Sequence, residues 1–155
     1  MLAKNPSFRT DHTRLGKGVY LSCTNGDIQT WDIRISEPNR GEYLSTGVCH
    51  TMEHLFSTYA RNGRFQDRII HIGPMGSRTG LVLLTRNMSS GEVLSLIQES
   101  FLFMSTYEGD IPGVSVEECG NFMDHDLQGC HRVSEEFLKV LMKIDPEKMK
   151  YTEDL

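Results

Sequence analysis

An alternating run of apolar and polar residues from 29 to 35 constrains the fold of this chain more than any other feature of its sequence. Successive side chains of a β-strand point to opposite faces, so the run predicts a strand with one buried and one polar face. The expected buried residues are Trp31, Ile33 and Ile35. The expected polar residues are Thr30, Asp32 and Arg34. The turn dipeptide Asn25-Gly26 precedes the run and predicts a hairpin with residues 18–23.

Two further β-rich runs, 68–73 and 79–86, are joined by a short loop that contains Gly and Pro. Short loops between neighbouring strands favour an antiparallel sheet. Helical spacing of apolar residues predicts three helices: roughly residues 47–61, a segment that begins at a Ser89–Glu92 capping box, and roughly residues 126–144. Strands and helices do not alternate regularly. We therefore expect an α+β fold, an antiparallel sheet packed against helices, in a single domain that spans residues 1–155.

The composition excludes several classes of protein. Of the 155 residues, 38% are hydrophobic and 24% are charged, which is typical of a globular chain and excludes wholesale disorder. The net charge of −5 and the scattered basic residues argue against a nucleic-acid partner. The apolar runs are far shorter than the roughly 20 residues that cross a bilayer, and no signal-peptide pattern is present. We expect a soluble, cytoplasmic protein with no membrane partner, whose four cysteines stay reduced.

The segment from His50 to His54 carries the clearest chemical signal. Residues four apart lie above one another on a helix, so the two imidazoles can share a metal ion, and Glu53 lies on the same face. The alternative is a pair of histidines on a solvated face. The remaining surface of this helix is strongly apolar, which indicates burial, and buried histidines need partners. The pattern therefore favours a metal site.

The third ligand decides what kind of metal site this is. His-x-x-Glu-His is also the inverted signature of zinc peptidases, in which the glutamate is the general base. Such an enzyme would take a further ligand from a larger catalytic domain. Here Cys119, in a turn before the last predicted helix, could instead complete a His₂Cys site with one open position. The alternative for Cys119 is a buried thiol without a function.

Several short motifs occur in order along nearly the whole chain. They are Ser7-Phe8 with Asp11-His12, Asp32-Ile33-Arg34 with Glu37-Pro38-Asn39, the His50–His54 segment, the 73–80 loop, Glu118-Cys119-Gly120, and His125-Asp126-Leu127. Together they resemble the S-ribosylhomocysteine lyase family, whose members make the precursor of the quorum-sensing signal autoinducer-2. The joint pattern is highly specific, although each motif alone is short.

The resemblance implies a reaction and its metal. It implies that His50, His54 and Cys119 bind one divalent ion, natively iron(II), which zinc or cobalt can replace. The reaction moves a sugar carbonyl from C1 to C3 through enediolate intermediates and then eliminates homocysteine. A metal ion with an open position would polarise the carbonyl and stabilise the enolate oxygen. Glu53 would be one general acid/base.

The resemblance also implies how substrate and subunits are arranged. S-ribosylhomocysteine would contact Ser7, His12, Arg34 and Ile72. The family is homodimeric, its active sites lie at the subunit interface, and the N-terminal segment of one subunit helps to close the site of its partner.

Position 77 departs from the family pattern. The family carries its second acid/base cysteine here, whereas this chain has Ser77. A serine hydroxyl is a far weaker acid than a thiol, so we expect impaired turnover. His71 and Thr30 also differ from many members, which would affect substrate contacts. The alternatives to the lyase are a small zinc peptidase and a non-catalytic protein that binds metal or ligand.

Overall fold

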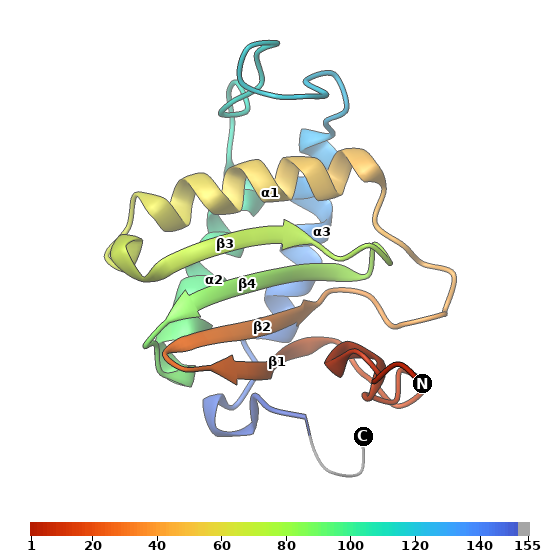
Figure 1. The fold of residues 1–155 in the computed structure, drawn as a ribbon. Coiled ribbons are helices and arrows are strands. Elements are labelled where there is room, and N and C mark those ends of the chain that lie inside the picture. Colours follow the sequence, from red (N-terminus) through yellow and green to blue (C-terminus); the bar gives the residue numbers. More distant parts are fainter. Residues whose placement is uncertain (152–155) are drawn as a thin grey trace.

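The computed structural model describes residues 1–151 and shows a four-stranded sheet with three helices on one of its faces (Figure 1). The strands are β1 (Gly18–Asn25), β2 (Ile28–Arg34), β3 (Ile69–Pro74) and β4 (Gly80–Arg86), in the spatial order β1-β2-β4-β3. All three neighbouring pairs are antiparallel. The predicted α+β class is confirmed, and so is the hairpin through Asn25-Gly26.

The helices begin where the sequence places good N-caps. They are α1 (Thr46–Arg61), α2 (Ser90–Thr106) and α3 (Leu127–Leu141). The side chain of Ser45 caps α1, and the Ser89–Glu92 capping box at α2 has both of its hydrogen bonds. The third helix is shorter than the predicted 126–144, because Asp126 is its N-cap and the α-helix ends at Leu141.

The core lies between the sheet and the three helices. Trp31 and Ile33 are fully buried, as their alternation predicts. Aromatic contacts join the helices to one another: the ring of Phe101 on α2 lies 6.0 Å from Phe56 of α1 and 5.1 Å from Phe137 of α3. The helices therefore form one continuous layer against the sheet, which gives α1 a rigid support.

A long loop, residues 107–126, connects α2 to α3 and rises above α1 at the top of Figure 1. Loops of this length without helices or strands are uncommon in a compact domain and are often functional. The loop carries Cys119, so it is the part of the chain that can bring a thiol to the histidines of α1. No helix among residues 1–151 has the length and apolar character of a membrane span.

Candidate metal and substrate site

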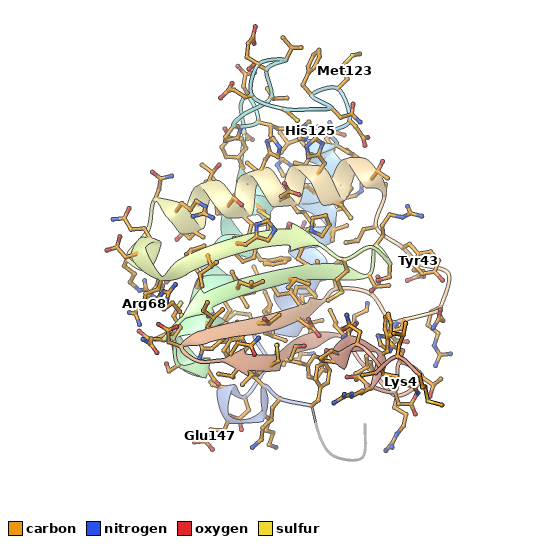
Figure 2. All side chains as sticks on the ribbon, viewed as in Figure 1. Lys4, Tyr43, Arg68, Met123, His125 and Glu147 are labelled. Atoms are coloured by element: carbon orange, nitrogen blue, oxygen red, sulfur yellow. The ribbon has the colours of Figure 1, made fainter. Side chains whose placement is uncertain are left out.

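Four donor side chains meet between α1 and the 107–126 loop. His50 and His54 project from α1, whereas Cys119 and His125 come from the loop, and one ligand atom from each lies within 4.8 Å of all the others. The Cys119 Sγ atom is 3.3 Å from Nε2 of His50 and 3.9 Å from Nε2 of His54. The predicted convergence of the two histidines with Cys119 is present in the structure. Figure 2 shows His125 directly between α1 and the loop.

The orientation of both helical imidazoles suits metal binding. His50 Nδ1 lies 2.9 Å from the Asp124 carbonyl oxygen, and His54 Nδ1 lies 2.7 Å from the Pro112 carbonyl oxygen. A carbonyl oxygen can only accept, so each Nδ1 carries a hydrogen, and in the neutral imidazole Nε2 is then the nitrogen with the lone pair. Metal-binding histidines typically have this arrangement. The ligand set therefore fits a single divalent ion that is intermediate between hard and soft, the kind of metal ion that imidazole and thiolate ligands bind.

Thr51 connects the loop to α1 beneath the donors. Its side chain is fully buried, and its hydroxyl oxygen accepts a 2.9 Å hydrogen bond from the backbone N–H of Asp126. The same hydroxyl lies 3.1 Å from Nδ1 of His125. One threonine thus fixes both the start of α3 and the ring of His125. The sequence analysis did not select Thr51, because its partners are more than 70 residues away.

His125 is a donor that the sequence analysis did not single out as a ligand. Its ring stacks on that of His50, with centroids 3.9 Å apart, and its Nε2 atom is buried without a hydrogen-bond partner among residues 1–151. Burial lowers the pKa of His125, and the nearby His50 and His54 lower it further. The imidazole is therefore kept neutral and able to ligate. Together, the four residues offer three or four protein ligands.

Glu53 lies beside the donors but is not one of them. It is half-buried on α1, and it lines a hollow of about 230 Å³ together with His54, Pro112 and Gly113. The four converging donors do not include its carboxylate. A carboxylate next to a metal site, but outside its ligand set, can transfer protons to a bound substrate.

Ser77 lies in the loop between β3 and β4 and is exposed. Its hydroxyl oxygen is 2.8 Å from that of Thr79, which is a neutral partner that cannot serve as a base. Thr79 is buried, and its backbone carbonyl accepts hydrogen bonds from the N–H groups of Ile35 and Ser36. The loop is therefore held against the end of β2, where Arg34 lies.

Arg34 is buried, although strand alternation places it on the polar face. It is 5% exposed and Asp32 is 8% exposed, because the C-terminal Tyr151 covers this part of the sheet. An Arg34 NH group approaches the sulfur of Met75 in the Ser77 loop at 3.9 Å. The structure thus brings Arg34 and the Ser77 loop together within one chain.

The other predicted substrate contacts are dispersed. Ser7 and His12 belong to the N-terminal segment, where their side chains bond locally to Asn5 and Thr10. This segment lies at the opposite end of the molecule from His125, as the labels of Lys4 and His125 in Figure 2 show. Ile72 is 2% exposed and packs in the core on β3, so within one chain it is closed to a ligand.

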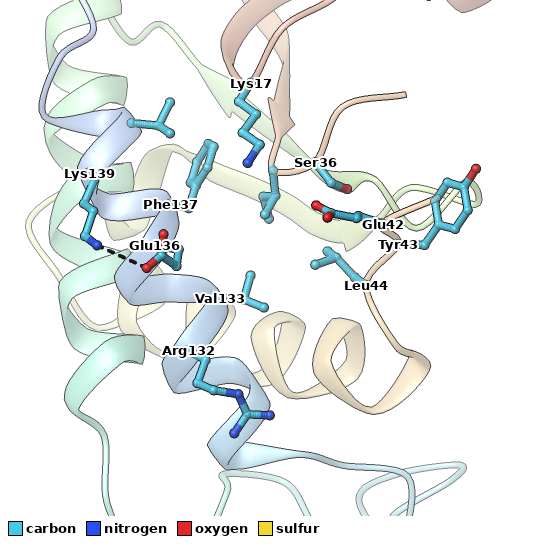
Figure 3. A pocket seen from close by; sticks show the side chains of 12 residues that line it. Lys17, Ser36, Glu42, Tyr43, Leu44, Arg132, Val133, Glu136, Phe137 and Lys139 are labelled. Carbon is cyan, nitrogen blue, oxygen red and sulfur yellow. Dashed lines mark hydrogen bonds and ion pairs between the residues drawn. The ribbon is translucent and has the colours of Figure 1, made fainter. Parts of the chain in front are cut away.

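A separate hollow of about 500 Å³ lies between α3 and the segment that leads from β2 to α1 (Figure 3). Its floor is apolar, with Leu44, Val133 and Phe137, and its rim carries the ion pair between Lys139 and Glu136. The hollow is larger than the one beside Glu53, but no donor of the metal cluster lines it.

Comparison with known proteins shows which family this chain belongs to. Residues 6–148 match the family model described as S-Ribosylhomocysteinase (LuxS). The S-ribosylhomocysteine lyase of Finegoldia magna is 39% identical over 97% of this chain and 99% of its own length. The enzyme of the same name from Porphyromonas gingivalis is 40% identical over 94% of this chain and 96% of its own, and that of Phocaeicola vulgatus is 44% identical over 79% and 80%. The chain belongs to the S-ribosylhomocysteinase (LuxS) family.

Proposed function

We propose that this chain, as one domain over residues 1–155, is a metal-dependent carbon–sulfur lyase whose substrate is S-ribosylhomocysteine. The observation that carries the proposal is the convergence of His50, His54 and Cys119, with both imidazoles oriented by backbone carbonyls. These three residues would be the metal ligands, and iron(II) would be the native ion. The name of the relatives, S-ribosylhomocysteine lyase, supplies the substrate and the reaction.

The bound metal would supply Lewis acidity at the sugar carbonyl. Glu53 would exchange a proton with the sugar carbons, because it adjoins His54 in the hollow beside the ligands. Arg34, Ser7, His12 and Ile72 would hold the substrate.

The zinc peptidase of the sequence analysis receives no support from these observations. A peptidase that uses the two histidines and Glu53 has no need of a thiol among its ligands, whereas Cys119 lies within 3.3 Å of His50. The family assignment likewise favours the lyase.

Ser77 would limit turnover. Its hydroxyl is paired with that of Thr79 rather than with an imidazole or a carboxylate, so nothing in this contact removes its proton. This observation favours a second candidate function, a homologue that binds metal and substrate without completing the reaction. Loss of one acid/base group typically costs about 10²–10⁴-fold in rate.

We propose that the active form is a homodimer. The N-terminal segment leaves Met1, Leu2 and Phe8 exposed to solvent. The loop that carries Cys119 exposes Val116 and Met123 to 66% and 81%. A partner subunit would cover such apolar side chains and would bring Ser7 and His12 to a site that they do not reach within one chain. The free thiols suit a cytoplasmic location.

The decisive experiment combines metal analysis with a thiol-release assay. Protein purified without oxygen should contain about one divalent ion per chain. The natural chain should bind S-ribosylhomocysteine but release almost no homocysteine, whereas Ser77→Cys should restore release by a factor of about 100 or more. If neither protein releases homocysteine although both bind the substrate, the non-catalytic alternative holds. If neither binds it, the proposed function is wrong.

A further inference from the structure

The C-terminal end of the described chain folds back along the edge strand β1. Met149 is 2% exposed, and its carbonyl accepts a 2.9 Å hydrogen bond from the N–H of Leu21 on β1. Lys150 extends this contact as a parallel bridge with Leu21. The main chain is therefore anchored immediately before Tyr151, whose position is set by the fold.

The ring of Tyr151 is held by β1 and β2 together. It stacks on the ring of Tyr20, with centroids 4.7 Å apart and planes only 5° from parallel. Its hydroxyl donates a 2.5 Å hydrogen bond to Oδ2 of Asp32 and accepts a 2.9 Å bond from Nε of Arg34. Arg34 and Asp32 are separated by 3.4 Å, which is long for a direct charged contact. The phenol is thus the closer partner of both charged groups.

This arrangement fixes the guanidinium and leaves part of it unused. Tyr151 takes the Nε hydrogen and Asp32 takes one hydrogen of NH2, whereas the remaining contact, from NH1 to the Met75 sulfur, is long at 3.9 Å. A guanidinium has five N–H donors, so at least two of those of Arg34 have no oxygen acceptor among residues 1–151. Burial and the neighbouring Asp32 raise the pKa of Tyr151, so the phenol keeps the proton that it donates.

We propose that Tyr151 is a positioning residue, which holds the guanidinium of Arg34 so that its free N–H donors face an oxygen acceptor of the substrate. The proposal rests on the proposed function, since that function makes Arg34 a substrate contact. The Tyr151 hydroxyl suits this position because a hydroxyl can donate to Asp32 and accept from Arg34 at once. Phenylalanine keeps the stack on Tyr20 but loses both hydrogen bonds.

The test is calorimetric titration of S-ribosylhomocysteine into the metal-loaded natural chain, Tyr151→Phe, Tyr151→Ala and the control Tyr59→Phe. Tyr59 packs on Phe103, away from Arg34, so its variant should match the natural chain. The dissociation constant should rise about tenfold in Tyr151→Phe, as expected for a lost hydrogen bond to a charged group, and at least as much in Tyr151→Ala.

The binding stoichiometry separates positioning from general destabilisation. A merely structural role would lower the number of binding-competent molecules and leave the dissociation constant of the rest unchanged. Positioning predicts the reverse, a weaker constant at full stoichiometry. Unchanged or tighter binding by Tyr151→Phe would overturn the proposal, since tighter binding would mean that the hydroxyl obstructs Arg34. If the natural chain and Tyr59→Phe do not bind the substrate, the proposed function fails first and this inference fails with it.

Discussion

Replacing Thr51 by valine tests whether the position of the 107–126 loop depends on a single buried hydroxyl. Valine keeps the branched shape of threonine, so it leaves no cavity, but it removes the oxygen that meets the Asp126 N–H at 2.9 Å and the His125 Nδ1 at 3.1 Å. Thr51 is 0% exposed, so water cannot replace the lost oxygen. The substitution therefore leaves two polar groups without their partner at the junction of α1 and α3.

The expected loss of stability follows from the cost of such groups. A buried polar group left unpaired costs about 1–3 kcal/mol, and the half-buried position of His125 and Asp126 favours the lower end of that range for each. We expect Thr51→Val to lower the free energy of unfolding by about 2 kcal/mol. With a urea dependence of about 2 kcal/mol per molar, the unfolding midpoint should fall by about 1 M.

The assay is urea unfolding of the metal-free protein in the presence of a chelator, so that metal binding does not contribute. The matched control is Thr106→Val at the exposed end of α2, where the hydroxyl bonds only to carbonyls of its own helix. The control should change the midpoint by less than about 0.3 M, as for an ordinary surface substitution. A similar small change in Thr51→Val would refute the argument that this hydroxyl fastens the loop.

The thiol ligand, the acid/base residue and the buried histidine make three further predictions. Cys119→Ala should bind less metal, and its cobalt-substituted form should lack the thiolate-to-metal charge-transfer absorption of the natural chain; persistence of that band would exclude Cys119 as a ligand. In a Ser77→Cys background, Glu53→Gln should keep its metal and lose homocysteine release by about 100-fold, so loss of metal would contradict a proton-transfer role. The lowered pKa of His125 means that the metal-free fold binds fewer protons there than the unfolded chain. Neutral His125 therefore makes its full contribution to the free energy of unfolding above the ordinary histidine pKa of 6.5. That contribution is lost as the pH falls. His125→Gln should therefore reduce the difference in urea midpoint between pH 7.5 and pH 5.5; an unchanged difference would refute the assignment.

Local patterns in the sequence predicted the elements well, because local physical chemistry decides them. Alternation placed Trp31 and Ile33 in the core, and the capping box fixed the start of α2. The spacing of His50 and His54 set their common direction, since residues four apart on a helix lie on one face. Each of these features depends on neighbours within a few residues.

The remaining parts of the site depend on partners far along the chain. His125 belongs to a motif that the sequence analysis named, but its stacking on His50 depends on the path of the 107–126 loop. Periodic patterns in the sequence do not predict the path of such a loop. In the sequence, Thr51 has no feature that distinguishes it from other helix residues. Its role becomes visible only in the structure, where Asp126 lies beside it. Arg34 lies on the polar face that the alternation predicts, but it is buried rather than exposed. The reason is that Tyr151, more than 100 residues further along the chain, covers it.

The proposed metal ligands and the proposed acid/base position 77 are supported by different elements. The donors are fixed by α1 and the 107–126 loop, through the carbonyls of Asp124 and Pro112. Ser77 belongs to the β3–β4 loop, whose contacts run instead to Thr79 and the end of β2. A change of cysteine to serine at this position removes none of the contacts that orient the donors. We therefore expect metal binding and turnover to be separable, so that a chain with Ser77 keeps the first while it loses the second.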